Sequence, residues 1–170
     1  MKKIICVLMA LVLMLSLTAC GANSSYKSVV KTMIKAMEKC DAEKMIKIFP
    51  DEFLEYMCEE EYDDDYDDMV DDLEDSLEDS MDWWEDQYGR DIKLTYEIDD
   101  ADELDEDEIE ALMDYYDDVM DLDLDIKKAY VVEVELDIEG KKDDGSEEMV
   151  LTVIKVGSKW YVDLMSFDIF

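Results

Sequence analysis

The stretch EEEYDDDYDDMVDDLEDSLEDSMDWWED, residues 59–86, contains 17 acidic residues and no basic residue among its 28 positions. Such a stretch is either a disordered acidic tract, a cation-binding segment or a folded helix with an acidic surface. Its apolar residues recur every three or four positions, which is the spacing of one helical face. They are Tyr62, Tyr66, Met69, Val70, Leu73, Leu77, Met81 and Trp84. The pattern predicts a single amphipathic helix that ends near Gly89.

The free energy of burial favours this helix over a disordered tract. Carboxylates three or four residues apart on a helix repel each other by only a few tenths of a kcal/mol per pair. Burying a Leu or Met side chain contributes roughly 1.5–3 kcal/mol. Burial therefore outweighs the repulsion wherever the apolar face of the helix has something to pack against.

The residues before the acidic stretch predict two shorter helices and the start of a third segment. A helix begins at Tyr26, with Ser24 or Ser25 as its N-cap. Asp41 caps a second helix, which Pro50 ends. The apolar face of the first helix is expected to consist of Val29, Val30, Met33, Ile34 and Met37, and that of the second of Met45, Ile46 and Phe49. Phe53, Leu54 and Met57 begin the next segment.

Beyond Gly89 the apolar period changes from that of a helix to the alternation of strands. The segments 91–98, 127–140, 147–156 and 159–170 predict four strands. Residues 141–146 (KKDDGS) predict a hairpin loop, and Gly157-Ser158 predicts a tight turn. A further helix over 106–120 separates the first two strands. Its inward residues are expected to be Ile109, Leu112, Met113, Tyr116 and Met120.

This order of elements predicts an α+β fold, in which N-terminal helices pack on a mainly antiparallel four-stranded sheet. Disordered chains are poor in aromatic and aliphatic residues, whereas this chain has three Trp and ten Tyr. With one Pro and five Gly, it also has little linker composition. We therefore expect residues 26–170 to form a single acidic domain.

The N-terminus, MKKIICVLMALVLMLSLTACG (residues 1–21), has the features of a secretory signal: two lysines, an apolar run and small residues before a cysteine. The run of about 14 residues is shorter than the roughly 20 that a membrane-spanning helix needs. Leu17-Thr18-Ala19-Cys20 resembles the lipobox of bacterial lipoproteins. The resemblance implies that residues 1–19 are removed and that Cys20 is diacylglyceryl-modified, with 20–25 as anchor and tether. The alternative is an ordinary signal peptide cut near Ala19.

A lipid-anchored, extracytoplasmic location has consequences for the partners and the cysteines. Removal of Lys2 and Lys3 takes the formal charge from −34 to −36, which repels nucleic acid and anionic headgroups. We therefore expect a membrane partner through the anchor and no nucleic acid. Cys40 and Cys58 then lie in a compartment where disulfides persist. They are either bridged or buried as thiols, and their spacing does not decide between the two.

A second resemblance covers roughly residues 26–170. The helical half with KCDAEKMIKIF (39–49), followed by strands that end in VGSKWYVDL (156–164), resembles the nuclear transport factor 2-like, cystatin-like superfamily. Small lipoproteins of Gram-positive bacteria often carry such domains. The resemblance implies a curved sheet that wraps around the N-terminal helices as a cone with an open mouth. The helix at 106–120 departs from the simplest pattern of that superfamily.

The residue types present argue against catalysis. The chain has no histidine, which excludes Ser–His–Asp and Cys–His catalysis and His-containing zinc sites. No phosphate-binding glycine loop occurs. Among 50 carboxylates, no pair is distinguished as the acid and base of a glycosidase. We expect no enzymatic activity and no cofactor.

Calcium is the one cation that the composition suggests, because carboxylate oxygens are its preferred ligands. The local candidates are Asp63-Asp64-Asp65, Asp67-Asp68 and the alternating Asp121, Asp123 and Asp125. None matches the calcium loop of an EF-hand, because glycine is missing after the third ligand position. Diffuse, weak cation binding is the expectation, and a defined calcium site is the alternative.

Aromatic residues give the candidates for a ligand pocket. Trp84, Tyr96, Tyr130 and Trp160 fall on inward faces, where they either line a cavity in the cone or belong to its core. Trp83 cannot share the helical face of Trp84 fully, so we place this pair at the pocket edge.

The sequence thus predicts a cell-surface lipoprotein with a noncatalytic binding module for a cationic peptide, a basic protein surface or a small apolar ligand. The alternatives are a structural or accessory envelope protein with an acidic solubilising surface, and a weak calcium-binding protein. A deep apolar pocket would favour ligand binding, whereas a filled cone would favour the accessory role.

Overall fold

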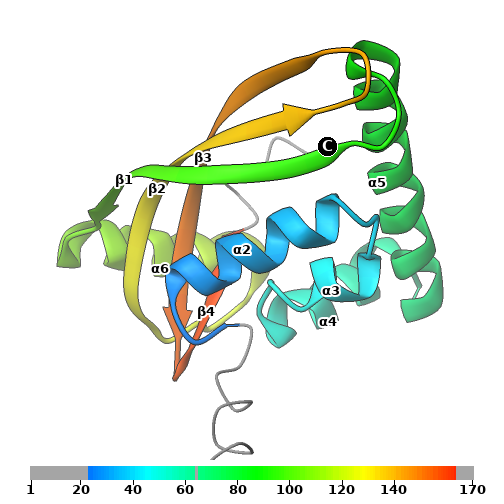
Figure 1. Ribbon diagram of the computed structural model, residues 1–170. Helices are drawn as coiled ribbons and strands as arrows, with labels where there is room; N and C mark the ends of the chain where they lie inside the picture. The colour runs from blue at the N-terminus through cyan, green and yellow to red at the C-terminus, as the bar shows by residue number, and fades with distance from the viewer. Residues whose placement is uncertain (1–22, 64, 164–170) are drawn as a thin grey trace, which may run out of the picture.

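The computed structural model describes residues 23–63 and 65–163. The predicted signal peptide, Cys20, Asp64 and the end of the last predicted strand lie outside the described residues. Helices precede the sheet in the chain, and one further helix lies between the first two strands (Figure 1). The helices are α2 (Tyr26–Met37), α3 (Ala42–Ile46), α4 (Asp51–Glu61), α5 (Tyr66–Tyr88) and α6 (Glu106–Met120). The strands are β1 (Lys93–Glu103), β2 (Ile126–Glu139), β3 (Asp144–Val156) and β4 (Lys159–Val162).

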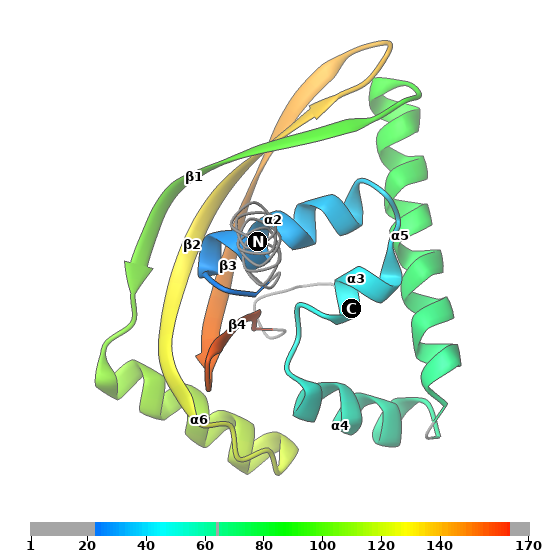
Figure 2. The same ribbon diagram turned by 60° about the horizontal axis from the view of Figure 1, so that its bottom comes forward.

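The sheet is an antiparallel meander in the order β1-β2-β3-β4, and it is not closed into a barrel. The register places Leu94 opposite Ile138, Val134 opposite Met149, and Val153 opposite Val162. Figure 2 shows the strands curving around α2. The predicted α+β class, with N-terminal helices on a four-stranded antiparallel sheet, is confirmed.

Helix α2 fills the concave face of this sheet. Ser25 caps the helix in a capping box: its side chain accepts from the Ser28 backbone N–H at 3.1 Å, and the Ser28 hydroxyl accepts from the Ser25 N–H at 2.8 Å. Val29, Val30 and Met33 of α2 are 0% exposed, and they belong to one core with the inward residues of β2 and β3. The interior of the predicted cone is therefore occupied by protein side chains.

The acidic stretch 59–86 is not one helix, and that prediction is corrected. Helix α4 ends at Glu61, Asp63 adopts a left-handed conformation (φ +50°), and α5 begins at Tyr66. The Asp65 side chain caps α5 by accepting from the backbone N–H groups of Asp67 and Asp68. Aspartate tolerates left-handed backbone and caps helices well, so the run of aspartates forms a turn. Tyr62 consequently lies in the turn rather than on the face of α5.

Strand boundaries also differ from the predictions, and the last predicted strand already ends at Val162. β1 continues beyond residue 98 to Glu103, because Ala101 and Glu103 pair with Val132 and Tyr130 of β2 after a bulge between Ile98 and Asp100. Alternation of apolar residues could not reveal this extension, since the added residues are mostly acidic. β3 begins at Asp144, which shortens the hairpin loop to residues 140–143.

The end of α5 docks on the β2–β3 hairpin. The Tyr88 carbonyl accepts from the backbone N–H groups of Lys142 at 2.9 Å and Asp143 at 3.0 Å. Gly140 allows this approach, because a Cβ there would lie 2.3 Å from the same carbonyl oxygen. From this attachment α5 runs along one side of the molecule to α4, with α3 between it and the sheet (Figure 2). The arrangement sets α5 opposite α3 and α4.

Candidate ligand-binding groove

A cavity of about 880 Å³ lies between α5 and the α3–α4 segment, and we refer to it as the groove. One wall comes from the end of α2, from α3 and from α4; the other comes from α5, and Met149 of β3 closes one end. The apolar lining residues are Met37, Met45, Ile46, Phe49, Phe53, Leu54, Met57, Met69, Leu73, Leu77, Trp84 and Met149. This volume falls within the roughly 300–1,000 Å³ typical of ligand pockets.

The wall opposite α5 follows from the way the chain turns at Pro50. Pro50 is the N-cap of α4 and has extended backbone, so α4 leaves α3 in a new direction. Phe49 and Phe53 lie on either side of this turn and are both buried, with ring centroids 6.2 Å apart. Helix α4 has one buried residue, Phe53, so Leu54 and Met57 are left half-buried facing the groove.

Methionine is the commonest residue type of the lining, with Met37, Met45, Met57, Met69 and Met149. Methionine is unbranched and polarizable, so it adapts to apolar groups of different shapes. The apolar lining residues, which we call the floor of the groove, can therefore adapt to ligands of different shapes.

The α5 rim of the groove is acidic and hydroxylic. Asp72, Asp75 and Asp79 line it together with Ser76 and Ser80, and all five side chains are exposed. Tyr62 also lines the groove and is half-buried. Burial, followed by the negative charges of Asp72 and Glu61, raises the pKa of its phenol. Helices α4 and α5 contain no basic residue. The groove thus combines an apolar floor with a negatively charged edge.

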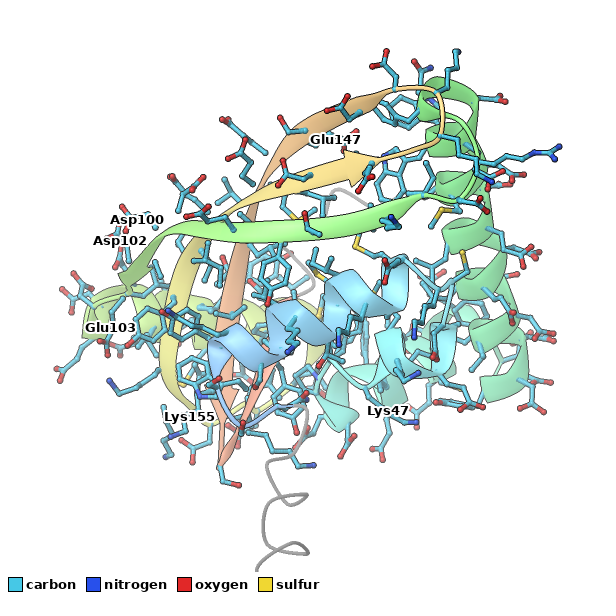
Figure 3. The ribbon with its side chains drawn as sticks, in the orientation of Figure 1. Lys47, Asp100, Asp102, Glu103, Glu147 and Lys155 are labelled. Atoms are coloured by element: carbon cyan, nitrogen blue, oxygen red, sulfur yellow. The ribbon has the colours of Figure 1, made fainter. Side chains whose placement is uncertain are left out.

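Among the aromatic pocket candidates, Trp84 lines the groove. It is buried, and its indole Nε1 donates to Glu147 Oε1 on β3 at 3.3 Å; Figure 3 shows Glu147 on β3 near the upper part of α5. Trp83 is 53% exposed. It follows Ser76 and Ser80 by seven and three residues, so it continues the strip of α5 on which these two serines lie.

The other three candidates do not line the groove. Tyr130 and Trp160 form an aromatic cluster with Tyr26 of α2, with centroid distances of 4.9, 5.5 and 6.0 Å. The Tyr130 hydroxyl also donates to Glu103 at 2.9 Å. Tyr96 is half-buried against the core, and burial raises the pKa of its phenol. These residues serve the packing of α2 on the sheet because α2 occupies the space that a cone-shaped pocket would need.

The aspartates suggested as calcium ligands have structural roles. Asp121 is the C-cap of α6 with a left-handed backbone (φ +55°), and Asp125 forms an ion pair with Lys127. Asp123 is exposed between them. Within residues 23–63 and 65–163, no group of three or more Cys, Asp or Glu residues comes together to hold a metal ion. At the far end of β1 from α5, Asp100, Asp102 and Glu103 lie near one another in Figure 3, and Glu103 pairs with Lys128.

Cys40 and Cys58 carry thiols and are not bridged, so the disulfide left open by the sequence is not formed. The Cys40 Sγ lies 3.5 Å from the Leu77 carbonyl, to which it donates from the turn between α2 and α3. Cys58 lies on α4 instead. Burial, followed by the charges of Glu78, Glu74 and Asp82, raises the pKa of the Cys40 thiol.

A buried polar pair lies outside the groove. Tyr116 of α6 is 1% exposed, and its hydroxyl donates to Asp163, which is 3% exposed and follows β4. Burial and then the charge of Asp163 raise the pKa of Tyr116. The Asp163 backbone N–H also donates to the Thr152 carbonyl at 2.8 Å. The pair therefore attaches α6 to the β3–β4 end of the sheet.

No family model, curated protein or solved structure matches the chain. Among the described residues, no helix has the combination of length and apolar character needed to cross a bilayer.

Proposed function

We propose that this chain is an extracytoplasmic lipoprotein, anchored to the cell membrane through Cys20, whose acidic domain is a noncatalytic binding module. The binding site is the groove between α5 and the α3–α4 segment. The observation that carries the proposal is a cavity of about 880 Å³ with a methionine-rich floor. The helices-then-sheet order also supports the proposed likeness to nuclear transport factor 2-like domains.

An apolar cavity of this size favours binding over a purely structural role. Protein interiors are close-packed, and lining atoms without partners lose dispersion contacts. A groove that keeps Leu54, Met57 and Leu73 half-buried therefore gains stability when an apolar group enters it. The acidic rim in addition favours a ligand that carries a positive charge next to the apolar group that enters the groove.

A structural or accessory envelope role is the second candidate, and the filled concave face of the sheet favours it. In that role the acidic surface provides solubility and spacing from the membrane, and the groove binds nothing. The two candidates differ in whether the groove has affinity for an apolar molecule.

The test is a titration of the chain lacking residues 1–20, which retains every described residue, with the neutral fluorescent probe N-phenyl-1-naphthylamine. We expect saturable binding with increased fluorescence. Ser76→Trp, which places an indole in the groove from the exposed rim, weakens binding at least tenfold. Ser158→Trp adds the same side chain at the exposed β3–β4 turn and leaves binding unchanged. Absence of saturable binding, or equal binding by the two variants, would reject the groove as the site.

The anchor is tested separately in a bacterial host that processes lipoproteins. Cys20→Ala removes the only thiol that the lipobox positions for acylation, so we expect the variant to leave the membrane fraction. Retention of the variant in that fraction would contradict lipid anchoring at Cys20.

A further inference from the structure

The rim of the groove is a row of carboxylates at helical spacing. Asp72, Asp75 and Asp79 are separated by three and four residues, so they project from neighbouring turns along one side of α5. No carboxylate of α5 forms an ion pair with a described lysine or arginine. Three negative charges at the edge of an apolar floor therefore lie without a positive partner in the described part of the chain.

The shape of the groove is long rather than round. On α5 its lining extends from Met69 to Trp84, which at 1.5 Å per residue is about 22 Å. This is the length of roughly four helical turns. A compact apolar molecule would contact only part of that floor, whereas an extended amphipathic chain would contact all of it.

Trp83 adds an exposed aromatic face beyond the end of the rim. It lies four residues after Asp79 on the same side of α5 and is 53% exposed. An indole face attracts Lys and Arg groups by cation–π interaction. The edge of the groove thus offers both carboxylates and an aromatic ring to a positively charged group.

We propose that the groove binds a basic amphipathic helical peptide segment, whose apolar face enters the methionine-rich floor and whose Lys or Arg residues meet Asp72, Asp75 and Asp79. This inference rests on the proposed function and specifies the partner of the same site. Helix-in-groove recognition needs apolar anchors one turn apart and a matching groove. Methionines allow such a groove to accept different apolar side chains. The formal charge of −34 on the chain draws cationic peptides to it before contact.

The probes are three synthetic 14-residue peptides, titrated calorimetrically into the chain lacking residues 1–20. The first has Leu on one helical face and Lys along its flanks. The second has Glu in place of Lys, and the third has the Leu and Lys of the first in an order without helical amphipathicity. We expect the first to bind one per chain, to displace N-phenyl-1-naphthylamine and to lose affinity as NaCl is raised. The second and third bind at least tenfold more weakly.

Two triple variants distinguish direct contact with the rim carboxylates from attraction to the overall negative charge of the chain. Asp72→Asn/Asp75→Asn/Asp79→Asn removes three charges from the rim, and we expect at least tenfold weaker binding of the first peptide. Glu74→Gln/Glu78→Gln/Asp82→Asn removes three charges from carboxylates of α5 that do not line the groove and whose charges act on Cys40. This matched control is expected to change the affinity less than threefold. Equal loss in the two variants would overturn the proposal, because diffuse attraction would then explain the binding.

Failure of this proposal is distinguishable from failure of the proposed function. If the neutral probe binds and the first peptide does not displace it, the occupant is a small apolar molecule, and the peptide proposal is overturned while the binding function stands. If neither binds, the binding function fails as well.

Discussion

At the scale of single residues, the Tyr116–Asp163 pair shows how a very acidic chain uses one carboxylate internally. Asp163 is the one charged side chain among the buried residues that the structure describes, and the Tyr116 hydroxyl donates to it. A hydrogen bond to a charged group contributes about 1.5–3 kcal/mol, because removing one partner leaves the other desolvated. The pair is therefore expected to matter more to stability than the exposed ion pairs, which contribute roughly 0–1 kcal/mol each.

The first prediction concerns the pH dependence of stability. The pKa of Tyr116 is raised above its ordinary value of 10.0, so above pH 10 the unfolded chain loses this proton while the folded chain keeps it. The free energy of unfolding then falls as pH rises, by up to about 1.4 kcal/mol per pH unit from this residue. Tyr116→Phe should be less stable at pH 7 but show a shallower loss between pH 10 and 11.5 in urea denaturation. The other tyrosines contribute equally to both proteins, so they do not affect the comparison. Equal slopes of the free energy of unfolding against pH for the two proteins would contradict the prediction.

The second prediction concerns the reactivity of Cys40. Burial and the carboxylates of Glu78, Glu74 and Asp82 raise the pKa of this thiol, so at pH 8 it holds less thiolate than a free cysteine. Alkylation of Cys40 by iodoacetamide, followed by peptide mass spectrometry, should be slower than alkylation of N-acetylcysteine. A rate equal to that of the free amino acid, or a mass two hydrogens lower from a Cys40–Cys58 bridge, would disagree with the structure.

At the scale of elements, α5 has apolar residues with different surroundings on one helix. Leu73 and Leu77 both line the groove, but Leu77 is buried and belongs to the core, whereas Leu73 is half-buried. Leu77→Ala should lower the free energy of unfolding by about 2–4 kcal/mol through lost burial and a new cavity. Leu73→Ala should cost less than half as much, since its surroundings are already open. Urea denaturation of both variants measures the difference, and equal losses would show that the groove is closed at Leu73.

Helices and strands with strong local signals could be predicted from the sequence. Ser25 and Asp41 cap α2 and α3 as expected, α6 occupies the predicted residues 106–120, and alternation located the interior of β2. The break at Asp63 and the extension of β1 to Glu103 could not be predicted from apolar spacing. The first depends on aspartate capping inside an acidic run, and the second on pairing with a distant strand.

The site was predictable only in part, because a groove between helices depends on how they are placed. Trp84 was expected at a pocket and lines the groove. Met45 was expected on the apolar face of its helix, but nothing in its spacing distinguishes a core position from a groove position. Asp75 has no feature in the sequence that distinguishes it from the other acidic residues of α5, since helical period cannot show which carboxylates lie at the edge of a groove.

At the scale of the whole molecule, a formal charge of −34 makes self-repulsion the main electrostatic effect. Salt shortens the range of this repulsion to about 10 Å at 0.1 M and about 3 Å at 1 M. The melting temperature should therefore rise by several degrees between 10 mM and 500 mM NaCl, at about 2–4 °C per kcal/mol gained. Differential scanning calorimetry measures this rise, and an unchanged midpoint would contradict it.

The same measurement separates diffuse cation binding from a calcium site. Diffuse binding to carboxylates predicts that 5 mM CaCl₂ and 5 mM MgCl₂ shift the melting temperature equally. A larger shift with calcium would indicate a defined site, because only specific binding to the folded state adds stability at equal charge.

The groove itself is tested most directly through its methionines. In the chain with ¹³C-labelled methionine methyl groups, each residue reports its own surroundings by NMR during titration with N-phenyl-1-naphthylamine. The methyl resonances of the groove are expected to shift together with one dissociation constant, while those of methionines elsewhere stay fixed. The groove group is Met37, Met45, Met57, Met69 and Met149, and the reference group is Met33, Met113 and Met120. Shifts confined to the reference group, or no shifts at all, would contradict binding in the groove.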